Sequence, residues 1–199
     1  MLASIRQVAG FVTKAAASRA DVRSVEHALT AVERRDSELG RKRPDRVAAI
    51  LATVQSDLDS ARRLRLARDQ WAIKSVAYRS YTRSVKAPLG ELSLMARGLD
   101  DIKRLAGPAS PVLARLTARA AAAVRGLGVV VPPADLASVH ALMVSAAQLA
   151  AQAVAVRRDA VTSGAMDRAW QASSAAAGAL MLLDRARKDL ESALVPPVL

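Results

Sequence analysis

The first 39 residues read MLASIRQVAGFVTKAAASRADVRSVEHALTAVERRDSEL, and apolar or small side chains recur in them every three or four positions. This heptad spacing places the recurring residues on one stripe of a helix, and a second helix must cover that stripe. The two interleaved rows are Met1, Val8, Ala15, Val22 and Leu29, and Phe11, Ser18, Val25, Val32 and Leu39. The pattern predicts one unbroken helix from about residue 2 to residue 39.

A second helix is expected from Pro44 to Ala87, because Gly40 suits the end of the first helix and Pro88 would end the second. Its apolar face changes along the way. An early row is replaced by a later one that is displaced by more than a quarter turn. The early row is Val47, Leu51, Val54, Leu58 and Ala61, and the later row is Leu64, Trp71, Tyr78 and Val85. The helix should therefore change its packing partner near residue 60.

These features predict two domains that share the second helix, at about 44–87. The first is a coiled-coil-like helical hairpin over residues 1–62, and the second is an antiparallel helical bundle over residues 63–199. Further helices should begin near Pro88, Pro111, Pro133 and Met166, because proline is favoured at the first helical position and Gly164 allows a tight turn. The predicted fold class is all-α, an elongated antiparallel bundle of five to six helices with a long N-terminal hairpin.

The composition favours closely packed helices. Hydrophobic residues make up 52% of the 199 residues, but only one Phe, two Tyr and two Trp are among them. Small side chains let helix axes approach closely. Trp71 and Trp170 are therefore expected as bulky core anchors, and His140 as a half-buried residue bonded to a neighbouring helix.

The sequence predicts no transmembrane segment. The apolar stretches at residues 141–156 and 175–183 are interrupted by Gln148, Gln152 or Gly178, and they are interpreted as buried helices. The basic N-terminus continues the heptad pattern, so we expect an ordinary first helix rather than a cleaved signal. The compartment stays open.

Residue types that carry catalysis are sparse. The chain has no cysteine, and its two histidines, His27 and His140, are far apart in sequence. It contains no Glu-x-x-His or His-Glu-x-x-His pair, no glycine-rich phosphate loop and no Gly-x-Ser-x-Gly elbow. We predict no catalytic, cofactor-binding or metal-binding residues, no cofactor, and a protein that is not an enzyme.

Positive charge is the strongest candidate for a binding signal. The net charge is +12, and residues 1–88 carry 18 Lys and Arg against 9 Asp and Glu. When the spacing of the early apolar row is continued along the second helix, it reaches a stripe of basic residues. The turn between the first two helices contributes further basic residues. The candidate anion-binding or partner-binding face is Arg41, Lys42, Arg43, Arg65, Arg68, Arg79, Arg83 and Lys86.

Two functions follow from this charge and the helical pattern. Phosphates of nucleic acid or an anionic surface could bind the basic face. However, Asp57, Asp59 and Asp69 interleave with it, and no helix-turn-helix accompanies it, so a solvated face is the preferred interpretation. We predict a non-catalytic structural or protein-interaction bundle that contacts a partner or itself through its helices, with the N-terminal hairpin as the expected contact surface. The alternative is a basic protein that binds nucleic acid or anionic surfaces weakly and without specificity.

The last third of the chain resembles helical-hairpin segments of uncharacterised bacterial proteins, many of them extracytoplasmic. The resemblance covers residues 128–197 and consists of the Pro132-Pro133 start, the early His140, the Gly164 turn and the following Ala169-Trp170 pair. Such segments have no assigned activity. This chain differs from the secreted examples in lacking an evident signal or a lipobox cysteine.

Overall fold

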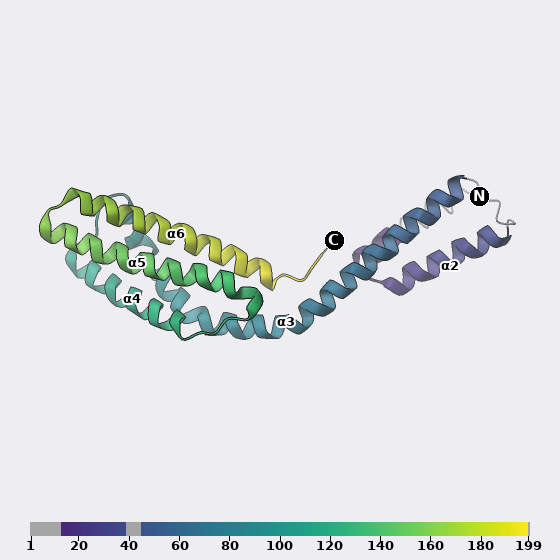
Figure 1. Cartoon of the computed structure of the whole chain (residues 1–199), viewed down its shortest axis with the longest axis horizontal. Coiled ribbons are helices and arrows are strands. Elements are labelled where there is room, and N and C mark those ends of the chain that lie inside the picture. The colour runs from purple at the N-terminus through teal and green to yellow at the C-terminus, as the bar shows by residue number, and fades with distance from the viewer. Residues whose placement is uncertain (1–12, 39–44, 199) are drawn as a thin grey trace. The chain divides into compact units, whose positions relative to one another are not determined.

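The computed structural model of the protein describes residues 13–38 and 45–198. Over these residues the chain is all-α and forms no strand. It divides into two compact units, of which the first contains Met1–Lys74 with Pro196–Leu199 and the second contains Ser75–Val195. Helix α3 (Asp45–Lys103) runs through both units (Figure 1). The boundary inferred from the sequence, between residues 62 and 63, lies earlier on this helix.

The prediction of one unbroken first helix is wrong. Residues 13–18 are helical, and the chain then turns at Ala20 before α2 (Val22–Glu38) begins. Ala20 has a left-handed φ of 59°, and the amides of Ala20 and Asp21 donate to the carbonyls of Ala17 and Ala16, at 3.0 and 2.9 Å. This bonding is the Schellman arrangement that ends helices.

A second local signal begins the next helix. The carboxylate of Asp21 accepts hydrogen bonds from the amide and the hydroxyl of Ser24, at 3.2 and 2.6 Å. Aspartate at this position satisfies an amide that the helix itself leaves unpaired. The heptad spacing continues across the break, and for this reason the spacing alone did not reveal it.

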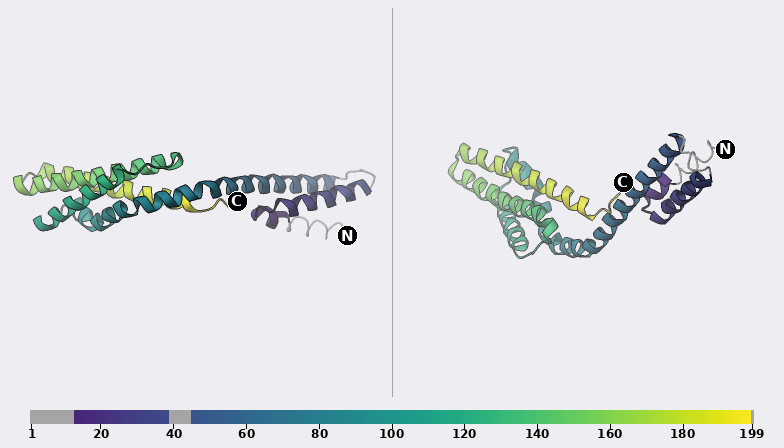
Figure 2. Two further views of the ribbon diagram at one scale, coloured as in Figure 1. Left: turned by 90° about the horizontal axis from the view of Figure 1, so that it is seen from below. Right: turned by 45° about the vertical axis from the view of Figure 1, so that its right-hand side comes forward.

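The first unit has a small core in which α2 lies beside the first part of α3 (Figure 2). The Oγ1 of Thr13 donates to a carboxylate oxygen of Asp57 at 2.7 Å, and Arg62 pairs with Glu26 at 2.9 Å. Val54, Leu58 and Ala61 of the early apolar row of α3 therefore pack against the N-terminal helices, as predicted. The buried residues of this core are Ala16, Ala17, Val25, Val54, Leu58 and Ala61.

Helix α3 does not end at Pro88, and the predicted boundary there is wrong. A proline inside a helix loses one hydrogen bond and strains the preceding turn, at a cost of about 3 kcal/mol. Here the proline is buried, and a Cβ placed on Gly126 would lie only 3.1 Å from its ring. Val85 and Leu92 on either side belong to one core. Burial of these flanking side chains offsets the cost of the proline.

The second unit is a four-helix bundle made of the second part of α3 with α4 (Ser110–Gly128), α5 (Ala137–Ser163) and α6 (Met166–Leu194). A short 3-10 helix, η1 (Ala134–Leu136), precedes α5. The predicted start of α6 at Met166 and the turn at Gly164, whose φ is 69°, are confirmed.

Contacts between helices establish an antiparallel order. Pro88 of α3 faces Gly126 of α4, whereas Gly98 faces Leu116, so residue numbers rise on one helix as they fall on the other. In the same way Ser93 bonds Arg187 of α6, and the Lys103 carbonyl accepts a 2.6 Å bond from Ser173. Helices α5 and α6 make the most extensive contact (Figure 1).

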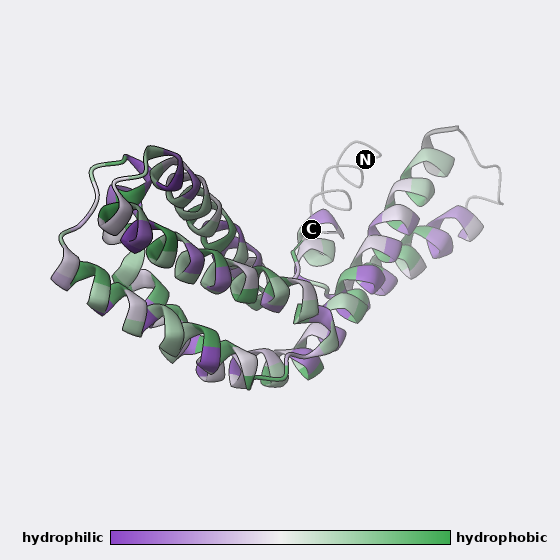
Figure 3. Cartoon of the chain, turned by 60° about the vertical axis from the view of Figure 1, so that its left-hand side comes forward, coloured by the Kyte–Doolittle hydropathy of each residue, from purple (hydrophilic) through white to green (hydrophobic). Residues whose placement is uncertain are grey.

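Of the later apolar row of α3, Tyr78 and Val85 are buried in the core of this bundle, with Tyr81 beside them, whereas Leu64 and Trp71 belong to the first unit. Since Ala61 packs in the first unit, the change of partner lies farther along α3 than residue 60. Much of the α5–α6 interface consists of alanine, and a Cβ on Gly178 would lie 3.2 Å from Leu149. Figure 3 shows hydrophobic and hydrophilic residues alternating around the helices, as amphipathic packing requires.

Candidate functional site

The structure describes five of the eight residues of the predicted basic face. Arg41, Lys42 and Arg43 lie outside the described residues. The other five side chains are on α3 and fall in different units. Arg65 and Arg68 belong to the first unit, and Arg79, Arg83 and Lys86 belong to the second.

In the first unit the two arginines make contacts with the protein itself. The Nε of Arg65 lies 3.2 Å from the carboxylate of Asp69, and both side chains are exposed. Arg68 donates to the backbone carbonyls of Arg19 and Ser18 at 2.9 and 3.4 Å, where the N-terminal helical segment ends. Carbonyls at a helix end lack partners within the helix. Arg68 is therefore a capping residue for that end.

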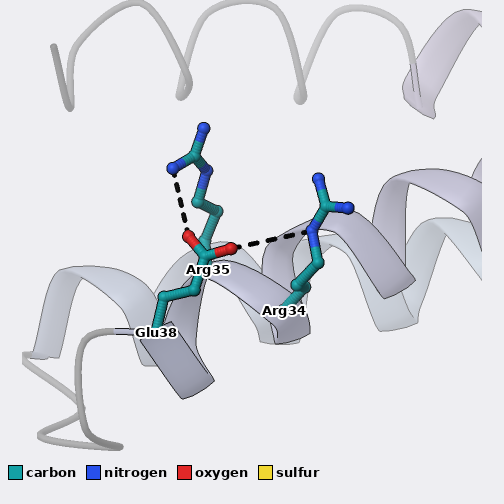
Figure 4. A network of polar contacts seen from close by, with 3 residues as sticks. All are labelled: Arg34, Arg35 and Glu38. Carbon is teal, nitrogen blue, oxygen red and sulfur yellow. Dashed lines mark hydrogen bonds and ion pairs between the residues drawn. The ribbon is translucent and has the colours of Figure 1, made fainter.

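Other charges of this unit form exposed pairs. Near the end of α2, Glu38 lies 3.1 Å from Arg35 and 3.8 Å from Arg34, and Figure 4 shows both arginines directed at its carboxylate. Exposed ion pairs contribute at most about 1 kcal/mol each. This network fits the interpretation of a solvated basic surface.

In the second unit the remaining basic residues face solvent. Arg79 donates to the Ser75 hydroxyl one turn earlier at 3.3 Å, and Arg83 donates to the Arg79 carbonyl at 3.5 Å. Lys86 is exposed. These contacts stay on α3 itself, so they neither order a pocket nor draw the cations together.

Two tyrosines one turn apart on α3 make polar contacts with η1 and α5 within the bundle. The Tyr78 hydroxyl donates to Asp135 of η1 at 3.0 Å. The Tyr81 hydroxyl shares a 3.0 Å hydrogen bond with Nδ1 of His140 on α5, and it lies 3.6 Å from the Met143 sulfur. His140 is half-buried and bonded to a neighbouring helix, so the prediction for it is confirmed.

Burial sets the protonation of this pair. It raises the pKa of Tyr81 to about 12 and lowers the pKa of His140 below its usual value, because charged forms are disfavoured away from water. At neutral pH both groups are therefore uncharged, and their hydrogen bond joins α3 to α5. Among the described residues, no three His, Cys, Asp or Glu side chains gather in a metal-binding arrangement.

The prediction that Trp170 is buried in the core is wrong. Its side chain is 60% exposed, on the second turn of α6. The neighbouring alanines Ala169 and Ala172 are buried instead. Alanines form much of the α5–α6 interface, and Trp170 lies outside it. Trp71, the other expected anchor, is half-buried on α3.

Trp170 belongs to a surface that sequence reasoning missed. Residues 137–156 of α5 and 169–183 of α6 contain no Lys, Arg, Asp or Glu. We call the solvent-facing residues of these two stretches the uncharged surface. Its large exposed side chains are Trp170 and Met181, which are 60% and 66% exposed, and its smaller exposed residues include Ala141, Gln148, Gln152 and Ser174.

The same composition gives one candidate membrane span. The segment Ala134–Ser163 is long and apolar enough to cross a membrane, judged by length and composition only. In the bundle this helix lies between α4 and α6 and buries one side, which includes Met143, Ala150 and Val154. A core helix of a helical bundle passes the same test.

Comparisons with protein-family models, with curated proteins and with solved structures found no match.

Proposed function

We propose that the protein is a non-catalytic helical bundle that binds a protein partner through the uncharged surface of α5 and α6. The observation that supports this most directly is the exposure of Trp170 and Met181, at 60% and 66%, within a stretch of α6 that carries no charge. Tryptophan is the residue most enriched among those that dominate binding energy at protein interfaces.

The surface differs from the rest of the bundle in a way that partner binding explains. Charged residues make up 24% of the chain, and α4 has three exposed or half-exposed arginines. Interface cores are depleted of charge and enriched in aromatic residues and methionine. Single exposed apolar residues are ordinary on any protein, but an uncharged surface shared by two adjacent helices is typical of a contact region.

The polar groups of the bundle support a structural role. Tyr81 with His140, and Tyr78 with Asp135, use their hydrogen bonds to join α3 to the segment that begins α5. We accordingly place partner binding on α5 and α6, instead of on the N-terminal hairpin or on the basic residues of α3.

Site-specific photo-crosslinking tests this function. A photoreactive phenylalanine analogue would replace Trp170 or Met181 in the protein produced in its native cells. The matched control replaces Leu94 of α3, which is 63% exposed and lies among charged residues. We expect protein adducts of increased mass at positions 170 and 181 but not at 94. Absence of protein adducts at both test positions would reject the proposal.

A further inference from the structure

We propose that the partner covering the uncharged surface is a second copy of this chain, so that α5 and α6 of two molecules pack against each other. This inference rests on the proposed function, since it names the occupant of the same surface. It follows from the charge of the chain, from the symmetry that two identical molecules require, and from the side chains that the surface offers.

Charge restricts where two copies can meet. The chain carries a net charge of +12, and α4 holds Arg115, Arg119 and Arg125 without any acidic residue. On α3 of the same unit, Arg79, Arg83 and Lys86 are exposed. Contact through α3 or α4 would bring like charges together, and such juxtaposition across an interface is strongly unfavourable. The α5–α6 side of this unit lacks that repulsion, because its middle turns carry no charge.

Symmetry adds a second requirement. In a two-fold dimer the same surface lies on both sides of the interface, so it must complement itself. A charged surface of one sign cannot do so, whereas an uncharged one can. Exposed Gln148, Gln152 and Ser174 each carry both a hydrogen-bond donor and an acceptor, so each can pair with a residue of this set on the facing molecule.

The side chains of the surface also suit close packing of helices. Small residues such as Ala141 and Ala177 lie on the solvent side of the two helices and would let a facing helix approach closely. Trp170 and Met181 supply the large apolar area that a stable interface needs. Burial of these two side chains would remove apolar surface that the single chain exposes to water.

The test is the mass of the full chain by sedimentation equilibrium and light scattering at micromolar concentrations. We expect a species of about twice the 21.0 kDa of one chain. Met181→Glu and Ala177→Glu should each raise the dimer dissociation constant at least tenfold, since each would bury an unpaired carboxylate in the uncharged interface. Leu94→Glu, the matched control on α3, should leave it unchanged. Circular dichroism should show the same helicity for all three variants.

Two results would overturn the inference. The first is a purified chain that stays monomeric at 100-fold higher concentration, and the second is a dimer that neither α6 variant weakens. If the monomeric chain instead gives adducts with a different protein at position 181, the second-copy inference fails while the proposed function stands. If the monomer sediments with anionic phospholipid vesicles and Met181→Glu abolishes this, the occupant is a lipid surface and the inference is also overturned.

Discussion

The hydroxyl of Tyr81 and Nδ1 of His140 lie 3.0 Å apart and join α3 to α5 across the core of the second unit. Their rings meet edge to face, with centroids 5.9 Å apart and an interplanar angle of 70°. Both groups are uncharged at neutral pH because burial disfavours their ionised forms. The pair therefore makes the stability of the bundle depend on pH in both directions.

On the alkaline side, Tyr81 should ionise with a pKa of about 12, compared with about 10 in the unfolded chain. Because the folded pKa is raised, the stabilisation is fully present below pH 10 and is lost as pH rises toward 12. The absorbance of phenolate at 295 nm measures this directly. Tyr78→Phe leaves Tyr81 as the one remaining tyrosine, and a midpoint near pH 10 in the folded variant would contradict the buried hydrogen bond.

On the acidic side, the lowered pKa of His140 means that the unfolded chain binds a proton more readily than the folded chain does. The free energy of unfolding should therefore fall as pH drops through about 6.5, the pKa expected for the unfolded chain, until the folded histidine also protonates. Urea denaturation at a series of pH values between 8 and 5 tests this. His140→Gln should make the free energy of unfolding less dependent on pH over this range. His27→Gln, at an exposed position of α2, should not.

Ala20 occupies a left-handed conformation that glycine adopts without strain. Ala20→Gly should therefore raise the stability of the first unit by about 1 kcal/mol. Ala17→Gly, inside the preceding helical segment, should lower it by about the same amount, because glycine weakens helices. Thermal denaturation, monitored by circular dichroism, would compare the stabilities of the two variants. An equal loss of stability in both would mean that Ala20 is not in the described turn.

The basic residues of the second unit should matter little for stability. Replacing Arg79 and Arg83 with Gln should change the free energy of unfolding by less than about 1 kcal/mol, since both side chains are exposed. We also expect only weak binding to nucleic acid, which should vanish near physiological salt. Submicromolar binding at about 150 mM salt that requires both arginines would favour the nucleic-acid alternative over the protein-interaction bundle.

The effect of Trp170→Ala on stability distinguishes a buried position from an exposed one. Replacement of a fully buried tryptophan by alanine would lower the free energy of unfolding by about 3 to 5 kcal/mol. Because the ring is 60% exposed, Trp170→Ala should cost less than about 1 kcal/mol. Met143→Ala, at a fully buried position of α5, serves as the comparison and should cost about 2 to 5 kcal/mol. An equal loss of stability in the two variants would mean that Trp170 is buried in the core.

The sequence predicted the all-α class and several of the helix ends, because apolar periodicity and the turn at Gly164 are determined by neighbouring residues in the sequence. It failed at Ala20, where the capping contacts of Asp21 and Ser24 end one helix and begin another without interrupting the heptad. It failed again at Pro88, because burial against Gly126 is a long-range effect that no local rule contains.

The candidate surface was missed for a related reason. A tryptophan in an alanine-rich helix is read as a core residue, and only the packed bundle shows that alanines already fill the α5–α6 interface. The signal that could have found it was present in the sequence. Residues 137–156 and 169–183 are both free of charge, yet each helix buries only part of its circumference.

The most direct test of the account is oxidation of Met181 in the folded protein. Its side chain is 66% exposed, whereas Met95 and Met143 are fully buried and serve as internal controls. Mass spectrometry would follow methionine sulfoxide formation in purified chain diluted until it is monomeric, and in native cells. We predict rapid oxidation of Met181 in the diluted chain, a rate several-fold lower in cells, and slow oxidation of both controls throughout. Equally rapid oxidation of Met181 in cells would show that no partner covers the α5–α6 surface and would contradict the account.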